Sequence, residues 1–281
     1  MKRLPEYSQH FLKSPQKIKE LIGHSTLKPG DTVYDIGAGS GTISSVLAGK
    51  VKKVVAVELE PRTVEKLREN MRPYPNVTVV QADFLDMPLP TTPYKVFANI
   101  PFHISSPIVH KLTDGDNSPK AAYLIVQKQF AHKLLPSSDR FTGQLGMLIG
   151  PWFAVRLRQR LERTDYFPHP NVDTAMIEIL HRDTPLIPLE ERAAYSEWVI
   201  GCFSTPKIFA KAPTREIGLP EGIKPSQMKL DQWVELFAAS KQIRTEPTPA
   251  SRTPRRPFSG RPSSPRSRSS NRQNRSPRPR S

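Results

Sequence analysis

The sequence predicts an α/β fold: an open, mostly parallel sheet with helices on both faces, followed by a small helical domain. Short apolar runs of strand length recur through the first part of the chain, and segments with helical periodicity separate them. After Phe141 the pattern changes to two longer strand-like segments, and from about residue 189 it becomes helical. Alternating strands and helices are typical of a parallel sheet, whereas two late strands in succession indicate an antiparallel addition.

Five apolar runs are the expected parallel strands, and most of them end at a polar residue or a turn. They cover residues 32–36, 53–57, 77–80, 94–98 and 122–126. Helices are expected at residues 42–48, 62–71 and 127–135. The second of these helices has Pro61 at its first position, where proline is tolerated, and it places Val64, Leu67 and Met71 on one face.

Two later strands, residues 152–161 and 175–180, are expected to form an antiparallel hairpin at the sheet edge. The first of them alternates between apolar and basic residues, so we expect one apolar face and one basic face. The apolar set is Val155, Leu157 and Leu161, and the basic set is Arg156, Arg158 and Arg160.

Composition divides the chain into three parts. Residues 1–182 hold the predicted sheet domain, and residues 183–240 hold the small helical domain. Residues 241–281 contain eleven arginines, one lysine and a single acid, so they carry +11 of the total net charge of +16. With eight prolines and one aromatic residue, this tail cannot form a core and we expect it to be disordered. Its charge favours binding to nucleic-acid phosphates, with a role in solubility or protein contacts as the alternative.

The composition also excludes several classes of protein. A single cysteine, Cys202, rules out an internal disulfide and fits a reducing cytoplasm. No apolar run is long enough for a membrane span, and the N-terminus shows no signal-peptide pattern. The histidines lack ligand spacing, so no metal is expected. We therefore expect a cytoplasmic protein, and a monomer because no heptad pattern indicates an interface.

Three successive strand ends carry residues suited to a nucleotide-like ligand. Residues 37–41, Gly-Ala-Gly-Ser-Gly, follow the first strand, where a parallel sheet leaves a crevice at its carboxyl edge. Glu58 ends the second strand, 21 positions after Gly37, where its carboxylate can accept both ribose hydroxyls. After the third strand, Asp83 offers an acceptor for an adenine amine, and Phe84 an aromatic ring beside it.

The fourth strand is followed by Asn99-Ile100-Pro101-Phe102, which has the chemistry needed to methylate an exocyclic amine. The side-chain oxygen of Asn99 and the carbonyl of Ile100 or Pro101 can accept both N–H groups of an adenine amine, leaving its lone pair aimed at a methyl donor. Phe102 can stack on the base. Alone, this motif is more often a simple turn. Together the four loops favour S-adenosylmethionine over NAD, because the pyrophosphate-binding glycine pattern is absent.

With these residues the chain resembles the rRNA adenine N6-dimethyltransferases, the superfamily of the KsgA and Erm enzymes, over about residues 7–240. Ser8-Gln9-His10-Phe11-Leu12 resembles the family's entry motif, and residues 167–173 resemble the element near its target-base pocket. The resemblance implies a Rossmann-like, S-adenosylmethionine-dependent methyltransferase. It implies that Asn99 and Phe102 are catalytic, and that the cofactor is bound by His10, Leu12, Gly37, Gly39, Glu58, Asp83, Phe84 and Asn99.

Within the superfamily, Asn-Ile-Pro-Phe and residues 150–153, Gly-Pro-Trp-Phe, are more similar to Erm enzymes, whereas residues 104–108 are similar to KsgA. The Erm resemblance implies methylation of N6 of one adenine in 23S rRNA before the large subunit assembles, and resistance to macrolide, lincosamide and streptogramin B antibiotics. A small-subunit dimethylase and a non-catalytic rRNA-binding assembly factor are the alternatives. The three strand arginines are then either a solvated sheet surface or a contact with RNA.

Overall fold

The structure, a computed structural model, describes residues 11–12, 14–115, 117–136 and 141–245. The described residues up to Thr245 form one compact unit. His10 and residues 246–281, which include most of the tail expected from residue 241, lie outside the described residues. No helix in the described ranges is both long and apolar enough to cross a membrane.

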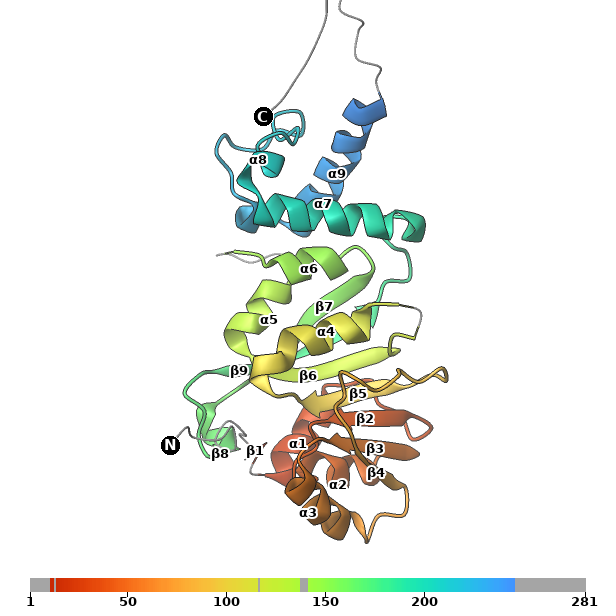
Figure 1. Ribbon diagram of the computed structural model, residues 1–281. Coiled ribbons are helices and arrows are strands. Elements are labelled where there is room, and N and C mark those ends of the chain that lie inside the picture. Colours follow the sequence, from red (N-terminus) through yellow and green to blue (C-terminus); the bar gives the residue numbers. More distant parts are fainter. Residues whose placement is uncertain (1–10, 13, 116, 137–140, 246–281) are drawn as a thin grey trace, which may run out of the picture. The chain divides into compact units, whose positions relative to one another are not determined.

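The centre of the described part is a seven-stranded mixed sheet (Figure 1). Its parallel strands run in the order β4 (Val77–Gln81), β3 (Lys53–Glu58), β2 (Thr32–Ile36), β5 (Lys95–Asn99) and β6 (Ala121–Gln127). Antiparallel to β6 lies β9 (Thr174–His181), and at the edge β7 (Phe153–Leu161) pairs antiparallel with β9. The predicted α/β class is confirmed, and every expected strand is present with bounds that agree to within one residue.

Helices cover both faces of the sheet because successive strand residues point to opposite faces. Val54 belongs to the core formed with α1 (Pro15–Gly23) and α2 (Thr42–Ala48). Val55, its neighbour, belongs to the core formed with α4 (Ser105–Thr113), α5 (Lys128–Leu134) and α6 (Gln144–Ile149). Helix α3 (Pro61–Met71) buries the predicted face of Val64, Leu67 and Met71. The sequence pattern had not indicated α1, α4 or α6.

The helical segment predicted after the sheet contains α7 (Arg192–Ser204), α8 (Pro206–Phe209) and α9 (Leu230–Thr245). Short 3-10 helices also occur at Arg163–Asp165, Leu189–Glu191 and Pro225–Gln227. The last long helix, α9, continues to Thr245, past residue 241, where the tail was expected to begin.

Aromatic side chains join this helical segment to the sheet. The Tyr195 hydroxyl donates to the Met147 carbonyl of α6 at 3.0 Å, and the Tyr195 ring meets Trp152 edge-on with 5.7 Å between centroids. Trp198 of α7 packs against Trp233 of α9 at 5.5 Å. The helices therefore share one core with α6 and one face of the sheet.

A β-bulge interrupts the alternation expected in β7. Leu157 pairs with Ile177 of β9, but Gln159 pairs with Met176, so one residue of β7 has no opposite partner. One inserted residue moves every later side chain of the strand to the other face.

The expectation of one apolar and one basic face in β7 was therefore wrong. Val155 packs in the core of α4, α5 and α6, whereas Leu161 packs in the core of α1 and α2, and Leu157 is exposed. The same shift places Arg156 and Arg160 on opposite faces of the strand, so the arginines form no continuous strip.

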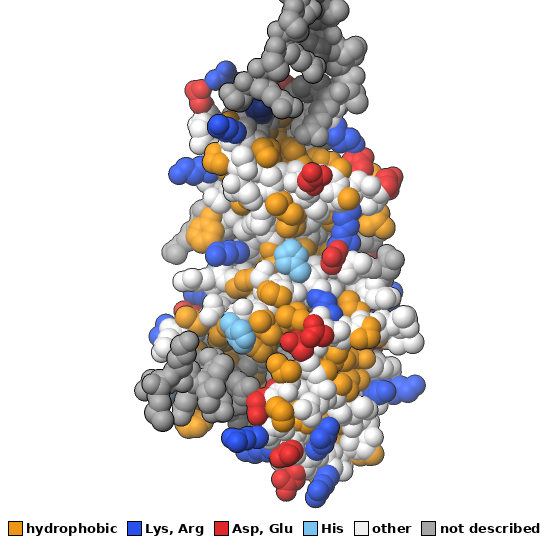
Figure 2. Space-filling view, viewed as in Figure 1, with side chains coloured by type: hydrophobic (Ala, Val, Ile, Leu, Met, Phe, Trp, Pro, Cys, Tyr) orange, Lys and Arg blue, Asp and Glu red, His pale blue; other side chains and the backbone are white. Residues whose placement is uncertain are grey.

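The chain before the tail, residues 1–245, is only moderately basic. Residues 246–281 hold ten arginines and one acid, so residues 1–245 carry +7 of the total charge of +16. On the face drawn in Figure 2, basic side chains lie among acidic, apolar and uncharged polar ones and form no single field.

Candidate active site

The predicted cofactor and catalytic residues gather at one edge of the sheet. Strands β4, β3, β2 and β5 are parallel neighbours, so their carboxyl ends lie side by side. Glu58 and Asn99 are the last residues of β3 and β5, and Gly37 and Asp83 lie in the loops after β2 and β4. The topology therefore brings together the four strand ends that the sequence singled out.

The glycine loop, residues 37–41, lies against the Asn99 loop, residues 99–102. Gly37 has a φ angle of +72°, and its N–H donates to the Val57 carbonyl at 2.8 Å, which fixes the turn onto β3. A Cβ at Gly37 would lie 3.2 Å from Cδ of Pro101, so the two loops approach this closely because no side chain separates them.

Glu58 is only 5% exposed, and backbone N–H groups fix its carboxylate. Oε2 accepts from the Gly39 N–H at 2.9 Å, while Oε1 accepts from the N–H groups of Leu59 at 2.9 Å and Glu60 at 3.1 Å. A carboxylate oxygen can accept more than one hydrogen bond, so Glu58 is oriented to receive further donors.

Leu59 is a candidate that the sequence reasoning missed. Its side chain is 59% exposed although it follows a buried strand directly. An apolar side chain left in solvent beside a fixed carboxylate is suited to cover the flat face of a ligand. In the sequence, the position of Leu59 directly after Glu58 was the signal that could have identified it.

Asp83 and Phe84 have different surroundings. Oδ1 of Asp83 accepts from the Leu85 N–H at 2.8 Å, which holds the half-buried carboxylate in a turn. The ring of Phe84 is buried in the core, with Nζ of Lys111 over it at 5.7 Å from the centroid. The Phe84 ring thus supports the loop, which leaves its backbone rather than its ring to meet a ligand.

The Asn99 loop turns directly into a 3-10 helix, Phe102–Ile104, and then α4. The Pro101 carbonyl accepts from the Ile104 N–H at 3.2 Å and from Oγ of Ser105 at 3.3 Å, so the turn itself uses it. Of the two carbonyls expected to accept an amine, that of Ile100 is therefore the better placed. Phe102 is half-buried at the start of this turn.

Asp35 is a second residue that the sequence reasoning missed. It is 1% exposed in β2, two positions before Gly37, and its Oδ2 accepts from Oγ of Ser44 in α2 at 2.7 Å. Burial, and in smaller part the charge of Glu58, raise the pKa of Asp35 to about 7, while the Ser44 hydrogen bond opposes this. In the sequence, the signal that could have identified Asp35 was an acidic residue within an otherwise mostly apolar strand.

A two-stranded sheet joins the N-terminal motif to the later Phe-Pro element. In it β1 (Phe11–Leu12) pairs antiparallel with β8 (Tyr166–Phe167), which sets Leu12 opposite Tyr166. Leu12 is buried in the core of α1 and α2, so only its backbone can face a ligand. Phe167 is 69% exposed. His10, which directly precedes β1, lies outside the described residues.

Comparison with known proteins decides the family. The model of the ribosomal RNA adenine dimethylase family matches residues 2–206. The chain belongs to this family. An rRNA adenine N-6-methyltransferase from Lysinibacillus sphaericus is 30% identical over 69% of this chain and 77% of its own length.

Family relatives of more than one kind match at similar identity. An rRNA adenine N-6-methyltransferase from Saccharopolyspora erythraea is 27% identical over 83% of this chain, and the chain spans 64% of that relative's length. A ribosomal RNA small subunit methyltransferase A from Latilactobacillus sakei is 28% identical over 70% of this chain and 69% of its own length. The solved structure of 23S rRNA methyltransferase ErmE superposes with a TM-score of 0.72 at 27% identity, covering 83% of this chain and all of that one.

Family and fold make the chain an S-adenosylmethionine-dependent rRNA adenine methyltransferase with a Rossmann-like sheet. The residues present fit the cofactor. A Cβ at Gly37 would fill the space between the glycine loop and Pro101. The buried carboxylate of Glu58 is fixed in an orientation that can accept hydroxyl groups. The loop that begins at Asn99 lies against the glycine loop, as the approach of Gly37 to Pro101 shows.

Proposed function

We propose that this protein transfers methyl groups from S-adenosylmethionine to N6 of one adenine in 23S rRNA, and so confers resistance to macrolide, lincosamide and streptogramin B antibiotics. The observation that carries the proposal is the contact between the glycine loop and the Asn99 loop, with 3.2 Å between a Cβ at Gly37 and Pro101. A cofactor held by the first loop lies next to the amine acceptors of the second. We further propose a cytoplasmic monomer that acts on protein-free rRNA.

Cofactor binding in this proposal rests on fixed acceptors. S-adenosylmethionine, when bound, supplies a methyl group activated by a sulfonium. Glu58 accepts from its ribose hydroxyls, Asp83 accepts from its adenine amine, and Leu59 covers one face of its adenine. The other proposed cofactor residues contribute mainly backbone or lie outside the described residues: Gly37, Gly39, Leu12, Phe84, Asn99 and His10.

Positioning of the target amine rests on the Asn99 loop. The Asn99 side-chain oxygen and the Ile100 carbonyl accept the two N–H groups, because the turn already uses the Pro101 carbonyl. Phe102 stacks on the base, which has to leave its helix to reach the site. No general base is required, since a quaternised nitrogen loses its proton readily. The protein therefore contributes mainly proximity and alignment.

The 23S target is favoured by the Asn-Ile-Pro-Phe sequence and by the likeness to a 23S rRNA methyltransferase over the whole of that chain. A small-subunit rRNA dimethylase is the second candidate, because relatives so described match at 28% identity and residues 104–108 are similar to that branch. A non-catalytic assembly factor is the third candidate, and the intact Glu58 and Asn99 argue against it.

The deciding experiment measures transfer of labelled methyl from S-adenosylmethionine to protein-free 23S rRNA and to assembled 30S subunits, with primer extension to map the base. We expect label at a single adenine of the peptidyl-transferase region in 23S rRNA. Glu58→Gln, matched with the exposed Glu65→Gln of α3 as a control, should lose transfer through weaker cofactor binding.

The other outcomes assign the alternatives. Label confined to 30S subunits would move the protein to the small-subunit branch. Cofactor binding without label on either RNA would identify a non-catalytic binding protein.

A further inference from the structure

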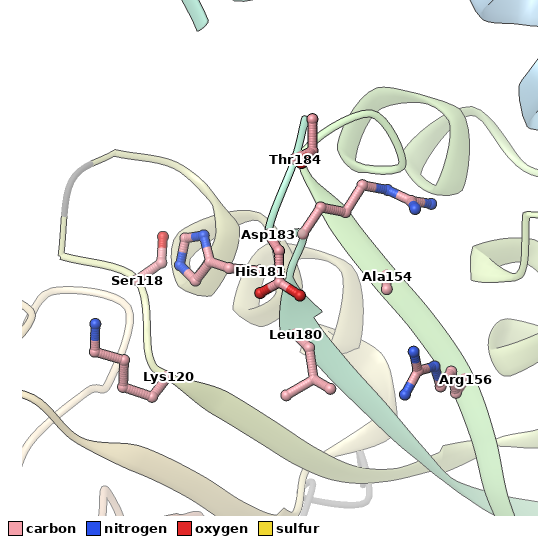
Figure 3. A pocket seen from close by; sticks show the side chains of 9 residues that line it. Ser118, Lys120, Ala154, Arg156, Leu180, His181, Asp183 and Thr184 are labelled. Carbon is pink, nitrogen blue, oxygen red and sulfur yellow. The ribbon is translucent and has the colours of Figure 1, made fainter. Parts of the chain in front are cut away.

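A cavity of about 850 Å³ lies at the sheet edge opposite the candidate active site (Figure 3). Its lining includes Lys120, directly before β6, Arg156, near the start of β7, and His181, at the end of β9. Because β9 runs antiparallel to β6 and β7, all three positions lie at the amino edge of the parallel strands. Along β6, Lys120 lies five residues, or about 17 Å, before Ile125, the residue that pairs with Asn99.

Positive charge gathers at this cavity. Lys120, Arg156 and Arg182 line it, and among the described lining residues only Asp183 is acidic. Burial, and then the charge of Arg156, lower the pKa of the Arg182 guanidinium. In the same way burial, and then the charge of Lys120, lower the pKa of His181. Like charges held this close repel one another, so an anion between them stabilises the arrangement.

Two of the three cations are available to a ligand. Lys120 is exposed and has no acidic partner within 4 Å among the described residues. Arg156 lies 3.9 Å from the buried carboxylate of Glu178, yet 62% of its side chain is exposed. Arg182 differs, because its Nε donates to the Gly150 carbonyl at 2.7 Å and forms part of the wall.

The arrangement of the charges points to a particular kind of ligand. Figure 3 shows Lys120 and Arg156 on opposite sides of the cavity, with the carboxylate of Asp183 between them. A free phosphate gains nothing from Asp183, which repels it. Along an RNA strand, however, phosphates alternate with riboses, and the ribose 2′-hydroxyl can donate to a carboxylate. This hydroxyl also lets a protein distinguish RNA from DNA.

We propose that the cavity binds backbone of the RNA substrate, with Lys120 and Arg156 on phosphates and Asp183 accepting from a ribose 2′-hydroxyl. The inference rests on the proposed function for the identity of that RNA. A distance of about 17 Å is less than one turn of a nucleic-acid helix, about 34 Å, so on this proposal the nucleotides that occupy the cavity flank the target adenine.

The first test compares two exposed lysines that each directly precede a strand at this edge, Lys120 before β6 and Lys52 before β3. Binding of the full-length protein to a protein-free 23S rRNA transcript is measured over a series of salt concentrations. Lys120→Gln should weaken binding about three- to tenfold and reduce the slope of log affinity against log salt by about one. Lys52→Gln should do neither. Equal effects of the two substitutions would overturn the proposal.

The second test addresses the ribose. Binding to RNA and to DNA of the same sequence is compared for Asp183→Ala and for Glu65→Ala, an exposed acid of α3. Asp183→Ala should reduce the preference for RNA by about threefold or more, and Glu65→Ala should leave it unchanged. If Asp183→Ala tightens RNA and DNA binding equally, the carboxylate is only a repulsive charge and the proposal fails.

Inorganic phosphate separates an RNA site from a site for a free anion. At constant ionic strength, phosphate should compete with RNA only weakly in the wild-type protein. Phosphate binding that Lys120→Gln abolishes, with RNA affinity unchanged, would assign the cavity to a free anion and overturn the proposal. All these measurements report binding, so they stay interpretable even if methyl transfer to 23S rRNA, the proposed function, is not found.

Discussion

In the proposed mechanism, methyl transfer depends on a few acceptor atoms of the Asn99 loop. Asn99→Ala removes one of two acceptors that orient the amine, so we expect kcat to fall about 10²- to 10³-fold. Cofactor affinity should change less, because Glu58 and Asp83 remain. Single-turnover transfer measures the first quantity, and calorimetric titration with S-adenosylmethionine measures the second. Near-normal turnover in this variant would contradict the mechanism.

Asp35 links the active-site edge to the stability of the fold. Its pKa of about 7 in the folded chain lies above that of a free carboxyl, about 3.9. Between about pH 4 and pH 7 the folded chain therefore keeps a proton that the unfolded chain loses. The free energy of unfolding consequently falls as pH rises through this window, by at most about 1.4 kcal/mol per pH unit from this group.

Asp35→Asn removes that titration while keeping an acceptor for Ser44. We expect the free energy of unfolding of the variant to depend less on pH between 4 and 7, and to exceed that of the wild type at pH 7.5. Urea denaturation at pH 5 and pH 7.5 measures both. An unchanged pH dependence would show that Asp35 is ionised in the folded protein.

Helix α3 packs unusually close to the glycine loop. A Cβ at Gly41 would lie 2.7 Å from both Cδ1 of Leu67 and Cε of Met71, and its φ angle is +91°. Gly115 offers a matched control, since its φ is +92° but nothing lies within 4 Å of its Cβ position. Both Ala variants suffer the backbone strain, whereas only Gly41→Ala also meets the clash.

We therefore expect Gly41→Ala to lower the free energy of unfolding by about 1–3 kcal/mol more than Gly115→Ala. Chemical denaturation of the two variants and the wild type gives the comparison. Equal losses would mean that the ends of the Leu67 and Met71 side chains move aside without cost.

Because of the bulge in β7, the arginines of this strand have different surroundings. Nε of Arg158 donates to the His24 carbonyl at 2.9 Å, and its guanidinium lies 3.8 Å from the buried carboxylate of Glu178. Arg160 is exposed on the face opposite Arg156. Because Arg158→Ala weakens compensation of a buried charge, we expect it to cost about 1–3 kcal/mol of stability. Arg160→Ala should cost less than about 0.5 kcal/mol.

Thermal and urea unfolding test this pair. Equal stability losses would contradict the assignment of Arg158 to structure. If Arg158→Ala destabilises the fold and Arg160→Ala does not, Arg160→Ala is the better of the two variants for testing whether this strand contacts RNA. Its effect on RNA affinity is then not mixed with a folding defect.

Features of the fold were predictable from the sequence where their cause lies among neighbouring residues, and were missed where it lies in distant ones. The strands and the loops after them were predictable because burial and turn chemistry act over a few neighbouring residues. The bulge in β7 was not, because its cause lies in the pairing with β9, and α6 is only six residues long, too short for helical periodicity to show. Asp35 escaped because its partner Ser44 lies on the helix beyond the glycine loop.

At the scale of the whole molecule, the candidate active site and most of the net positive charge lie in different parts of the chain. The described residues carry the site, while residues 246–281 carry ten arginines and one acid, a net +9. A chain ending at Thr245 keeps +7 and all the described elements. Long-range attraction to phosphates increases with the net positive charge of the protein, so it should weaken when the +9 of residues 246–281 is removed. Salt screens this attraction over about 8 Å at physiological ionic strength.

If the charge of residues 246–281 steers the protein toward rRNA, removing them should slow association about tenfold or more at 50 mM salt and much less at 300 mM. The methyl-transfer rate at saturating rRNA should stay within twofold of the full-length rate. Stopped-flow association at several salt concentrations and single-turnover transfer measure the two effects. A loss of transfer at saturating rRNA would place part of the tail in the active site, and an unchanged association rate would limit it to solubility or protein contacts.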